Sequence, residues 1–295
     1  MKYILLVLVC VSSLLGYSQI YPNIGQFQNA QLFYNPAYAG SGTQARACGI
    51  NRVQWTKYPG APSTQLLTAD APLGKNVGGG VVFDRFQIGN IVQINASVNA
   101  SYRINTGRES FLQFGLKGGI SQINFGAGVL SEFRWDENDP LITPNMNRGV
   151  IGTFGTGLYF KKKSFYAGLS VPDLVMIDPN KLYYDNASNK SLVKKNIFFN
   201  TGFKVNLSEF IAIQPNILVR YYATRPLNYY LNLSVIFNQT FTAGVGYVYP
   251  RGAALYTNVN VTPKIILGYR YEYNATSFGL GNYGSNEILI KYGFN

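Results

Sequence analysis

Apolar and polar residues alternate along much of this chain. In the stretch NIVQINASVNASYRIN (90–105), every second residue from Val92 to Tyr102 is apolar, and the residues between them are polar. A period of two is typical of a β-strand with one apolar face and one polar face. In a soluble protein the apolar face would contact a core, whereas in a membrane barrel it would contact lipid.

Fourteen segments after residue 45 combine such a pattern with turn residues at their ends. They are 46–57, 63–72, 76–86, 90–103, 110–124, 150–160, 164–171, 196–206, 209–222, 228–238, 240–249, 252–261, 264–274 and 285–293. Most are long enough to cross a bilayer as tilted strands, which takes about 9 to 11 residues. Bacterial single-chain barrels have an even number of strands. The pattern therefore predicts an all-β fold, a transmembrane antiparallel β-barrel of about 14 strands over residues 46–295.

The connections between these segments are sorted by length. Short ones, such as Thr106–Arg108 and Asn206–Ser208, follow even-numbered segments, whereas the long ones, 125–149, 172–195 and 275–284, all follow odd-numbered segments. Outer-membrane barrels have short periplasmic turns and longer external loops. We therefore expect the first strand to begin on the periplasmic side and every long loop to lie outside the cell, where loops on a rigid scaffold commonly bind partners.

The composition supports a surface in contact with outer-membrane lipid. Charged residues make up 13% of the chain, about half of the roughly 25% that is usual in soluble domains. The net charge of +12 is spread along the chain, and its one run, Lys161–Lys163, is expected to be a solvated turn, so no nucleic-acid partner is predicted. Tyrosines near segment ends predict interfacial aromatic girdles: Tyr221, Tyr222, Tyr229, Tyr230, Tyr247, Tyr249, Tyr271 and Tyr273.

The chain begins with a pattern typical of export. Lys2 precedes an apolar run, and small residues stand before Gln19, so residues 1–18 are expected to be a cleaved signal peptide. Cys48 would then be the single cysteine of the mature chain, which excludes an internal disulfide. Residues 19–45 are polar and rich in Asn and Gln, and we expect them either to plug the barrel lumen or to lie under its periplasmic mouth.

Candidate catalytic chemistry is sparse. The chain has no histidine, the commonest general base and metal ligand, so neither an enzyme nor a cofactor is predicted. The acidic residues Asp136, Glu137 and Asp139 are expected in a solvated loop, because the segment 132–139 lacks a full calcium-loop pattern; a bound metal there stays an open alternative. The glycines at 78–80 do not match a phosphate-binding loop and instead indicate a bend or a close backbone approach within a strand.

Several polar residues are expected on the lumen-facing side of the strands. They are Gln93, Asn95, Lys117, Arg220, Arg270 and Glu272. Charges inside a barrel either pair with each other to fill the interior or line a pore and bind a guest strand. The sequence leaves both alternatives open.

Two parts of the chain resemble the PorP/SprF family of outer-membrane proteins from the type IX secretion system. The first part contains a box of Asn35, Pro36, Ala37, Tyr38, Ala39 and Gly40, followed by the strand residues Arg52, Gln54 and Trp55 and by a Gly60–Pro62 turn. The second part is LGYRYEYN (267–274) followed by GSNEILIKYGF (284–294). Turn chemistry alone would also explain Pro36 and Gly40, and Trp55 would also suit an aromatic girdle.

The resemblance implies a function in protein secretion and gliding motility. It implies a Gram-negative outer-membrane barrel that helps to secrete or anchor a large surface adhesin by binding the C-terminal signal domain of that cargo. Periplasmic or outer-membrane secretion-system subunits would be further partners. The alternative from a different class is a passive pore or small-solute transporter, and a lipid-modifying enzyme is disfavoured because no histidine is available as a base.

Overall fold

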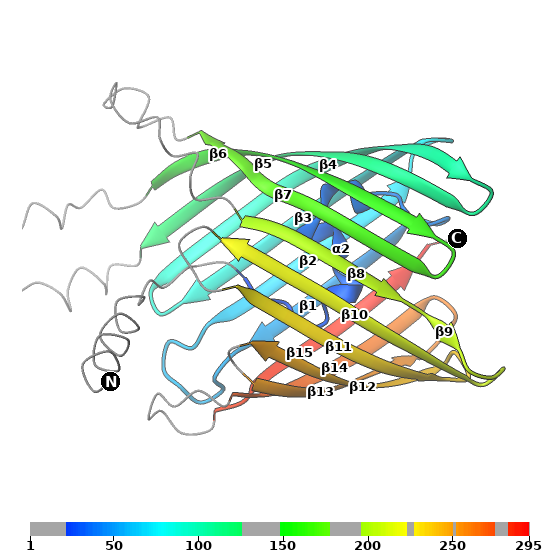
Figure 1. Ribbon diagram of the computed structural model, residues 1–295. Helices are drawn as coiled ribbons and strands as arrows, with labels where there is room; N and C mark the ends of the chain where they lie inside the picture. The colour runs from blue at the N-terminus through cyan, green and yellow to red at the C-terminus, as the bar shows by residue number, and fades with distance from the viewer. Residues whose placement is uncertain are drawn as a thin grey trace, which may run out of the picture.

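A computed structural model describes residues 22–125, 148–177, 196–222, 227–249, 252–274 and 283–294. They form one antiparallel sheet that closes on itself, because β1 pairs with β2 on one side and with β15 on the other. Figure 1 shows the resulting barrel with its tilted strands. The expected signal peptide and the acidic loop residues 132–139 lie outside the described residues.

The strands correspond closely to the predicted segments. They are β1 (Arg46–Val53), β2 (Ser63–Pro72), β3 (Val77–Ile88), β4 (Ile91–Gly107), β5 (Ser110–Phe125), β6 (Arg148–Lys162), β7 (Phe165–Ile177), β8 (Asn196–Phe203), β9 (Val205–Asn206), β10 (Ile211–Tyr222), β11 (Asn228–Phe237), β12 (Phe241–Tyr249), β13 (Gly252–Asn260), β14 (Ile265–Asn274) and β15 (Ser285–Gly293). Both β8 and β9 pair with the same side of β10 and act as one strand of the wall. The prediction of a 14-stranded closed barrel is therefore confirmed.

Pro215 lies where β8 gives way to β9. β10 pairs with β9 as far as Ile213 and with β8 from Asn216 onward, while its pairing with β11 continues without a break. Proline has no backbone N–H to donate to a neighbouring strand. The interruption at Lys204 therefore coincides with the position at which β10 lacks a donor.

Three predicted strand ends are wrong by four residues or more. β4 continues to Gly107 rather than ending at residue 103. β1 ends at Val53, not at residue 57, because Trp55 and Lys57 have positive φ angles of 50° and 88° and the Tyr58 N–H closes a turn onto the Trp55 carbonyl. β7 continues to Ile177 rather than ending at residue 171, with a shift of register between its pairings at Val171 and Val175. The predicted loop 172–195 therefore begins after Ile177.

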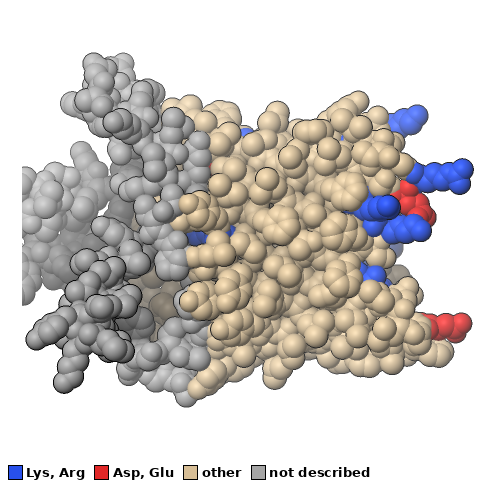
Figure 2. Space-filling view, in the orientation of Figure 1, with Lys and Arg blue, Asp and Glu red and all other residues tan. Residues whose placement is uncertain are grey.

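The two faces of each strand differ in exposure. On β4, the outward side chains of Val98 and Tyr102 are 64% and 53% exposed, whereas Asn99 and Ser101 between them are each 5% exposed. The apolar face of β4 therefore points to lipid and its polar face into the barrel. Figure 2 shows the visible side wall as a broad band without charged residues, with Lys, Arg, Asp and Glu gathered at one end. No helix among the described residues is long and apolar enough to span a membrane.

Aromatic residues mark both rims of this apolar wall. Tyr247, Tyr249 and Tyr271 are exposed near one rim, and Phe203 and Phe237 are exposed near the other. The girdle prediction is wrong for two tyrosines. Tyr222 and Tyr230 are 8% and 4% exposed and lie inside the barrel, as the alternation of neighbouring side chains in a strand requires.

The two ends of the barrel have different connections. The end that we call the short-turn end carries the brief links from β2 to β3, β4 to β5, β6 to β7, β9 to β10, β11 to β12 and β13 to β14, and the last described residues lie there. The opposite end, the long-loop end, is where β5, β7 and β14 finish. Short turns of outer-membrane barrels are periplasmic, so the long-loop end is the external one.

The barrel interior is filled by residues 22–45, which we call the luminal segment. It contains three short helices, η1 (Phe27–Asn29), α2 (Gln31–Tyr34) and η2 (Pro36–Tyr38), drawn in dark blue within the barrel in Figure 1. Ile24, Phe27 and Ala37 are fully buried and belong to one apolar cluster with inward-facing wall residues. The segment therefore provides the core that a hollow barrel of this size would lack.

Candidate functional site

The box Asn35–Gly40 folds around the side chain of its first residue. The Asn35 Oδ1 atom accepts a hydrogen bond of 2.9 Å from the Ala37 N–H, which caps η2, and its Nδ2 atom donates one of 2.8 Å to the Leu158 carbonyl on β6. Pro36 occupies the first position of η2, where its missing N–H is not needed. Asn35 therefore fixes the shape of the box and joins it to the barrel wall.

The backbone of the box is bonded to several strands. The Ser101 hydroxyl of β4 donates a 2.7 Å hydrogen bond to the Ala39 carbonyl, and the Gln113 side chain of β5 donates to the same oxygen at 3.2 Å. The Ser170 hydroxyl of β7 donates to the Tyr34 carbonyl at 2.7 Å. Buried backbone oxygens require such partners, so the wall is built to receive this segment.

Glycines in the wall make room for the box. A methyl group at Gly115 of β5 would collide with the backbone of Pro36 and Ala37, and one at Gly78 of β3 would collide with the Ala39 carbonyl. Of the bend and the close backbone approach considered for residues 78–80, the close approach is observed at Gly78, whereas a methyl group at Gly79 would meet the Leu73 side chain. A methyl group at Gly157 of β6 would meet the Asn35 side chain.

The box ends in an ionic contact near the short-turn end. Gly40 has a φ of +60°, which glycine adopts at little cost, and its N–H donates to Asp70 at 2.9 Å. Arg46 forms an ion pair with Asp70 at 2.9 Å, and its guanidinium lies 4.4 Å from the centre of the Tyr38 ring. These contacts hold the luminal segment where it joins β1.

Replacing Asn35 with alanine should weaken this attachment. The change removes both side-chain hydrogen bonds and leaves the buried Ala37 N–H and Leu158 carbonyl without those partners. We expect the free energy of unfolding in detergent to fall by about 1–3 kcal/mol, measured by urea titration with tryptophan fluorescence. Asn105→Ala at the exposed end of β4 is a matched control. An equal loss in both variants would contradict the role given to Asn35.

Four buried charges lie deeper in the lumen, toward the long-loop end, and we call them the charge cluster. Arg52 of β1 contacts Glu272 of β14 at 3.0 Å and Glu287 of β15 at 3.2 Å, and Arg270 lies 3.6 Å from Glu272. All four side chains are at most 1% exposed. Two positive and two negative charges balance, as burial of ions requires.

The charge cluster holds the beginning of the luminal segment. The two carboxylate oxygens of Glu287 accept hydrogen bonds from the Gly25 and Gln26 N–H groups at 2.7 and 2.8 Å. The Asn232 side chain of β11 donates to the Gly25 carbonyl at 2.9 Å. Nearby, burial raises the pKa of Tyr34, so its hydroxyl stays neutral while it accepts a hydrogen bond from the Ile24 N–H. The segment is thus bonded to the wall at both of its ends.

The remaining residues singled out in the sequence are placed as follows. Gln93, Asn95 and Lys117 line a cavity between the luminal segment and the wall, while Arg220 donates a 2.8 Å hydrogen bond to Asn196. Gln54 follows β1 and is buried, and its N–H donates a hydrogen bond to the Pro62 carbonyl. Trp55 is half-exposed and lies in the turn rather than in a strand. At the opposite end, Lys163 makes an exposed ion pair with Glu109 at 3.2 Å.

Sequence reasoning missed Glu287 and Asp173. Glu287 alternates with the outward Ile288 and Ile290, so the period of two in β15 already placed it inside. Asp173 was assigned to a loop because β7 was ended before Pro172, yet its carboxylate accepts a 2.9 Å hydrogen bond from the Lys117 ammonium.

The barrel is similar in fold to several solved outer-membrane proteins. The Ralstonia pickettii toluene transporter TbuX shares 8% identity with a TM-score of 0.52, over 90% of this chain and 94% of that one. The Acinetobacter baumannii protein Omp33 shares 10% identity with a TM-score of 0.48, over 85% and 98%. The monoaromatic hydrocarbon channel CymD shares 13% with a TM-score of 0.49, over 97% of each chain. At these identities the likeness concerns the fold alone.

No curated protein matches the chain. A family model does, and it describes a type IX secretion system membrane protein, PorP/SprF. The match runs over residues 17–292, so it includes the box, the luminal segment and every strand of the barrel. The chain therefore belongs to the PorP/SprF family of the type IX secretion system and is a non-enzymatic barrel of the outer membrane.

Proposed function

We propose that this barrel helps to secrete or surface-anchor a large adhesin by binding the C-terminal signal domain of that cargo. The observation that carries the proposal is the occupied lumen. The luminal segment is bonded to Glu287 at one end and to Asp70 at the other, with η2 seated against the wall between them. A barrel filled in this way supports a function at its ends rather than the passage of solutes through its centre.

The long-loop end is the surface that suits a folded cargo domain. The flanking strands show that the chain leaves and re-enters the barrel at that end before and after residues 126–147 and 178–195. Loops on rigid scaffolds commonly carry binding residues. Secretion-system subunits of the periplasm or the outer membrane would contact the barrel elsewhere, with the short-turn end available to periplasmic ones. The membership in the PorP/SprF family supports this secretion context.

The experiment that tests the proposal is an affinity pull-down. The tagged barrel is isolated from gently solubilised outer membranes, and its partners are identified by mass spectrometry. Recovery of a large surface protein together with secretion-system subunits is the expected result. Recovery of the barrel alone, from cells that express the cargo, would contradict the proposal.

Deleting residues 178–195 should abolish recovery of the cargo while leaving the barrel intact. The deletion removes one long connection but keeps every residue of β7 and β8, including Asp173. We expect cargo recovery to fall at least about tenfold, as the loss of a docking loop implies. Folding is checked by the shift in gel mobility on heating. Deleting residues 278–281 from a shorter connection is the control. Unchanged cargo recovery after deletion of residues 178–195 would refute the assignment of cargo binding to that connection.

The alternative is a passive pore or small-solute transporter. The observation that favours it is a cavity of about 340 Å³ beside the luminal segment. A pore would give steady single-channel current steps in a planar bilayer, whereas a barrel closed by residues 22–45 would not.

A further inference from the structure

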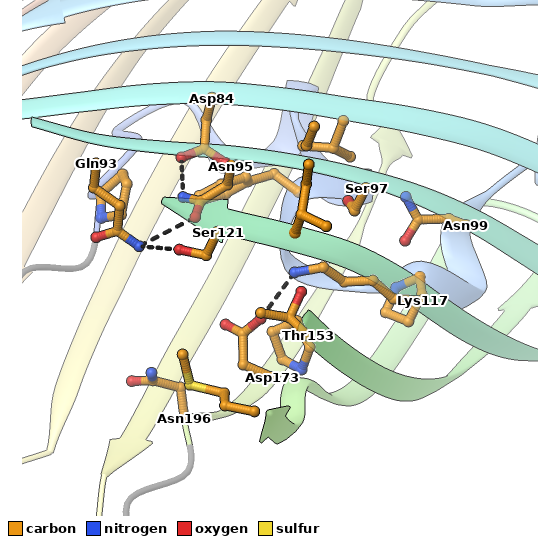
Figure 3. A pocket seen from close by; sticks show the side chains of 18 of the residues that line it. Asp84, Gln93, Asn95, Ser97, Asn99, Lys117, Ser121, Thr153, Asp173 and Asn196 are labelled. Atoms are coloured by element: carbon orange, nitrogen blue, oxygen red, sulfur yellow. Dashed lines mark hydrogen bonds and ion pairs between the residues drawn. The ribbon is translucent and has the colours of Figure 1, made fainter. Parts of the chain in front are cut away.

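The cavity lies between the luminal segment and the inner wall formed by β3 to β7, with β8 and β10 also reaching it. Figure 3 shows polar side chains that converge on it from several strands. Its volume of about 340 Å³ is within the range of small-ligand pockets. Val82, Leu32 and Met176 supply apolar surface. Pro36 is the one residue of the box that reaches it, and no residue of the charge cluster does.

One carboxylate in the cavity lacks a counter-ion. Asp84 of β3 is 3% exposed, and its Oδ2 atom accepts a 2.7 Å hydrogen bond from the Asn95 side chain. The Lys117 ammonium, the one cation among the described residues that line the cavity, is paired with Asp173 at 2.9 Å. Across the described part of the chain, no cation makes an ion pair with Asp84. With its three charged groups ionised the cavity has a net charge of −1, and a buried charge without a partner is costly.

A row of polar side chains follows β4 along the same cavity. Asn95, Ser97 and Asn99 are two residues apart and face the same side, about 6.6 Å from one to the next along a strand. An extended peptide presents its own backbone groups with that spacing. Asn99 is 5% exposed, and its Nδ2 atom has no hydrogen-bond partner among the described residues. It therefore offers a donor that an entering carbonyl oxygen would satisfy.

We infer that this cavity binds the amino end of a short extended peptide. The α-ammonium group lies against Asp84, a backbone carbonyl accepts a hydrogen bond from Asn99, and small side chains pack between Val82 and Leu32. The monocation neutralises the cavity, and the carbonyl satisfies the Asn99 amide. Capture of an amino terminus by a few fixed polar groups is an established mode of peptide recognition.

The test uses trialanine as its C-terminal amide, which is a monocation, and the whole barrel, refolded in detergent, in isothermal titration calorimetry. The N-acetylated form carries the same C-terminal amide. Trialanine should bind, and N-acetyltrialanine, which lacks the positive charge, should bind at least about tenfold more weakly, as expected for loss of a charge-assisted hydrogen bond. Asp84→Asn, which keeps the shape of the side chain, should cause a similar loss. Glu109→Gln, which removes one charge in an exposed turn at the opposite end, is the matched control and should leave binding unchanged.

Asn99→Ala provides a second variant if Asp84→Asn does not fold. It should weaken trialanine about threefold or more through the lost hydrogen bond and should leave the preference for the free over the acetylated amine intact. Absence of trialanine binding to the folded wild-type barrel would overturn the inference. Binding that survives both acetylation and Asp84→Asn would overturn it as well. Neither outcome bears on adhesin binding, because no cargo is present in the assay.

Discussion

Replacing Glu287 with glutamine is expected to destabilise the folded barrel by about 3–5 kcal/mol, the usual effect of breaking a buried ion pair from one side. Two positive charges, on Arg52 and Arg270, would then face Glu272 alone inside the barrel. The hydrogen bonds from the Gly25 and Gln26 N–H groups would also lose their charged acceptor. Both effects release the start of the luminal segment.

Urea titration in detergent, followed by tryptophan fluorescence, measures the change in unfolding free energy. Release of the segment is measured separately through the rate of maleimide labelling of a cysteine at position 26, in a background where Cys48 is replaced by alanine. Glu109→Gln is the control, since Glu109 is in an exposed ion pair worth at most about 1 kcal/mol. A Glu287→Gln barrel as stable as this control would show that the charge cluster does not hold the segment.

Replacing Gly115 with valine is expected to turn a closed barrel into a conducting one. The new side chain would occupy the space now taken by the backbone of Pro36 and Ala37, so the box has to leave its seat on β5. A small shift of the Pro36–Ala37 backbone cannot make room, because Asn35 and Ala39 on either side are bonded to β6, β4 and β5. The whole box is therefore displaced. With the box displaced, the lumen opens to water and ions.

Planar-bilayer recording measures this effect. Wild-type barrels should show no steady current steps, and Gly115→Val barrels should carry at least about ten times more ion current, because polar interiors of large barrels conduct when they are not plugged. Gly118→Val on the same strand is the matched control, since a side chain there would meet only the Phe154 ring at 4.0 Å. Steady current steps in the wild type would instead favour the pore alternative.

The fold could be predicted from the sequence because lipid favours apolar side chains and the lumen favours polar ones, and neighbouring residues of a strand face opposite sides. Val98 is apolar and faces lipid, whereas its neighbour Asn99 is polar and faces the lumen. Strand ends were less readable where backbone conformation decides them. Nothing in the residue types at Trp55 and Lys57 indicates positive φ angles, and Pro172 falls within a strand because β7 shifts its register there.

The site could be predicted only in part, because closure of the barrel decides which of its residues come into contact. Arg270 and Glu272 share the inward face of one strand, and that face was predicted, but their meeting with Arg52 depends on β15 pairing with both β14 and β1. The box could be assigned to turn chemistry from Pro36 and Gly40. That it would seat against glycines of β3, β5 and β6 requires the register of distant strands, which no local pattern contains.

The position of Glu287 also has a consequence for biogenesis. The Gly25 N–H is separated by 262 residues from the carboxylate that it contacts, and that carboxylate is on β15, the last of the described strands in chain order. Contacts between residues so far apart in the chain form late. The start of the luminal segment therefore cannot be bonded to Glu287 until β15 has joined the wall. Completion of the wall and attachment of this end of the segment are therefore a single event, and an unfinished barrel differs from a finished one by a detached Gly25 and Gln26.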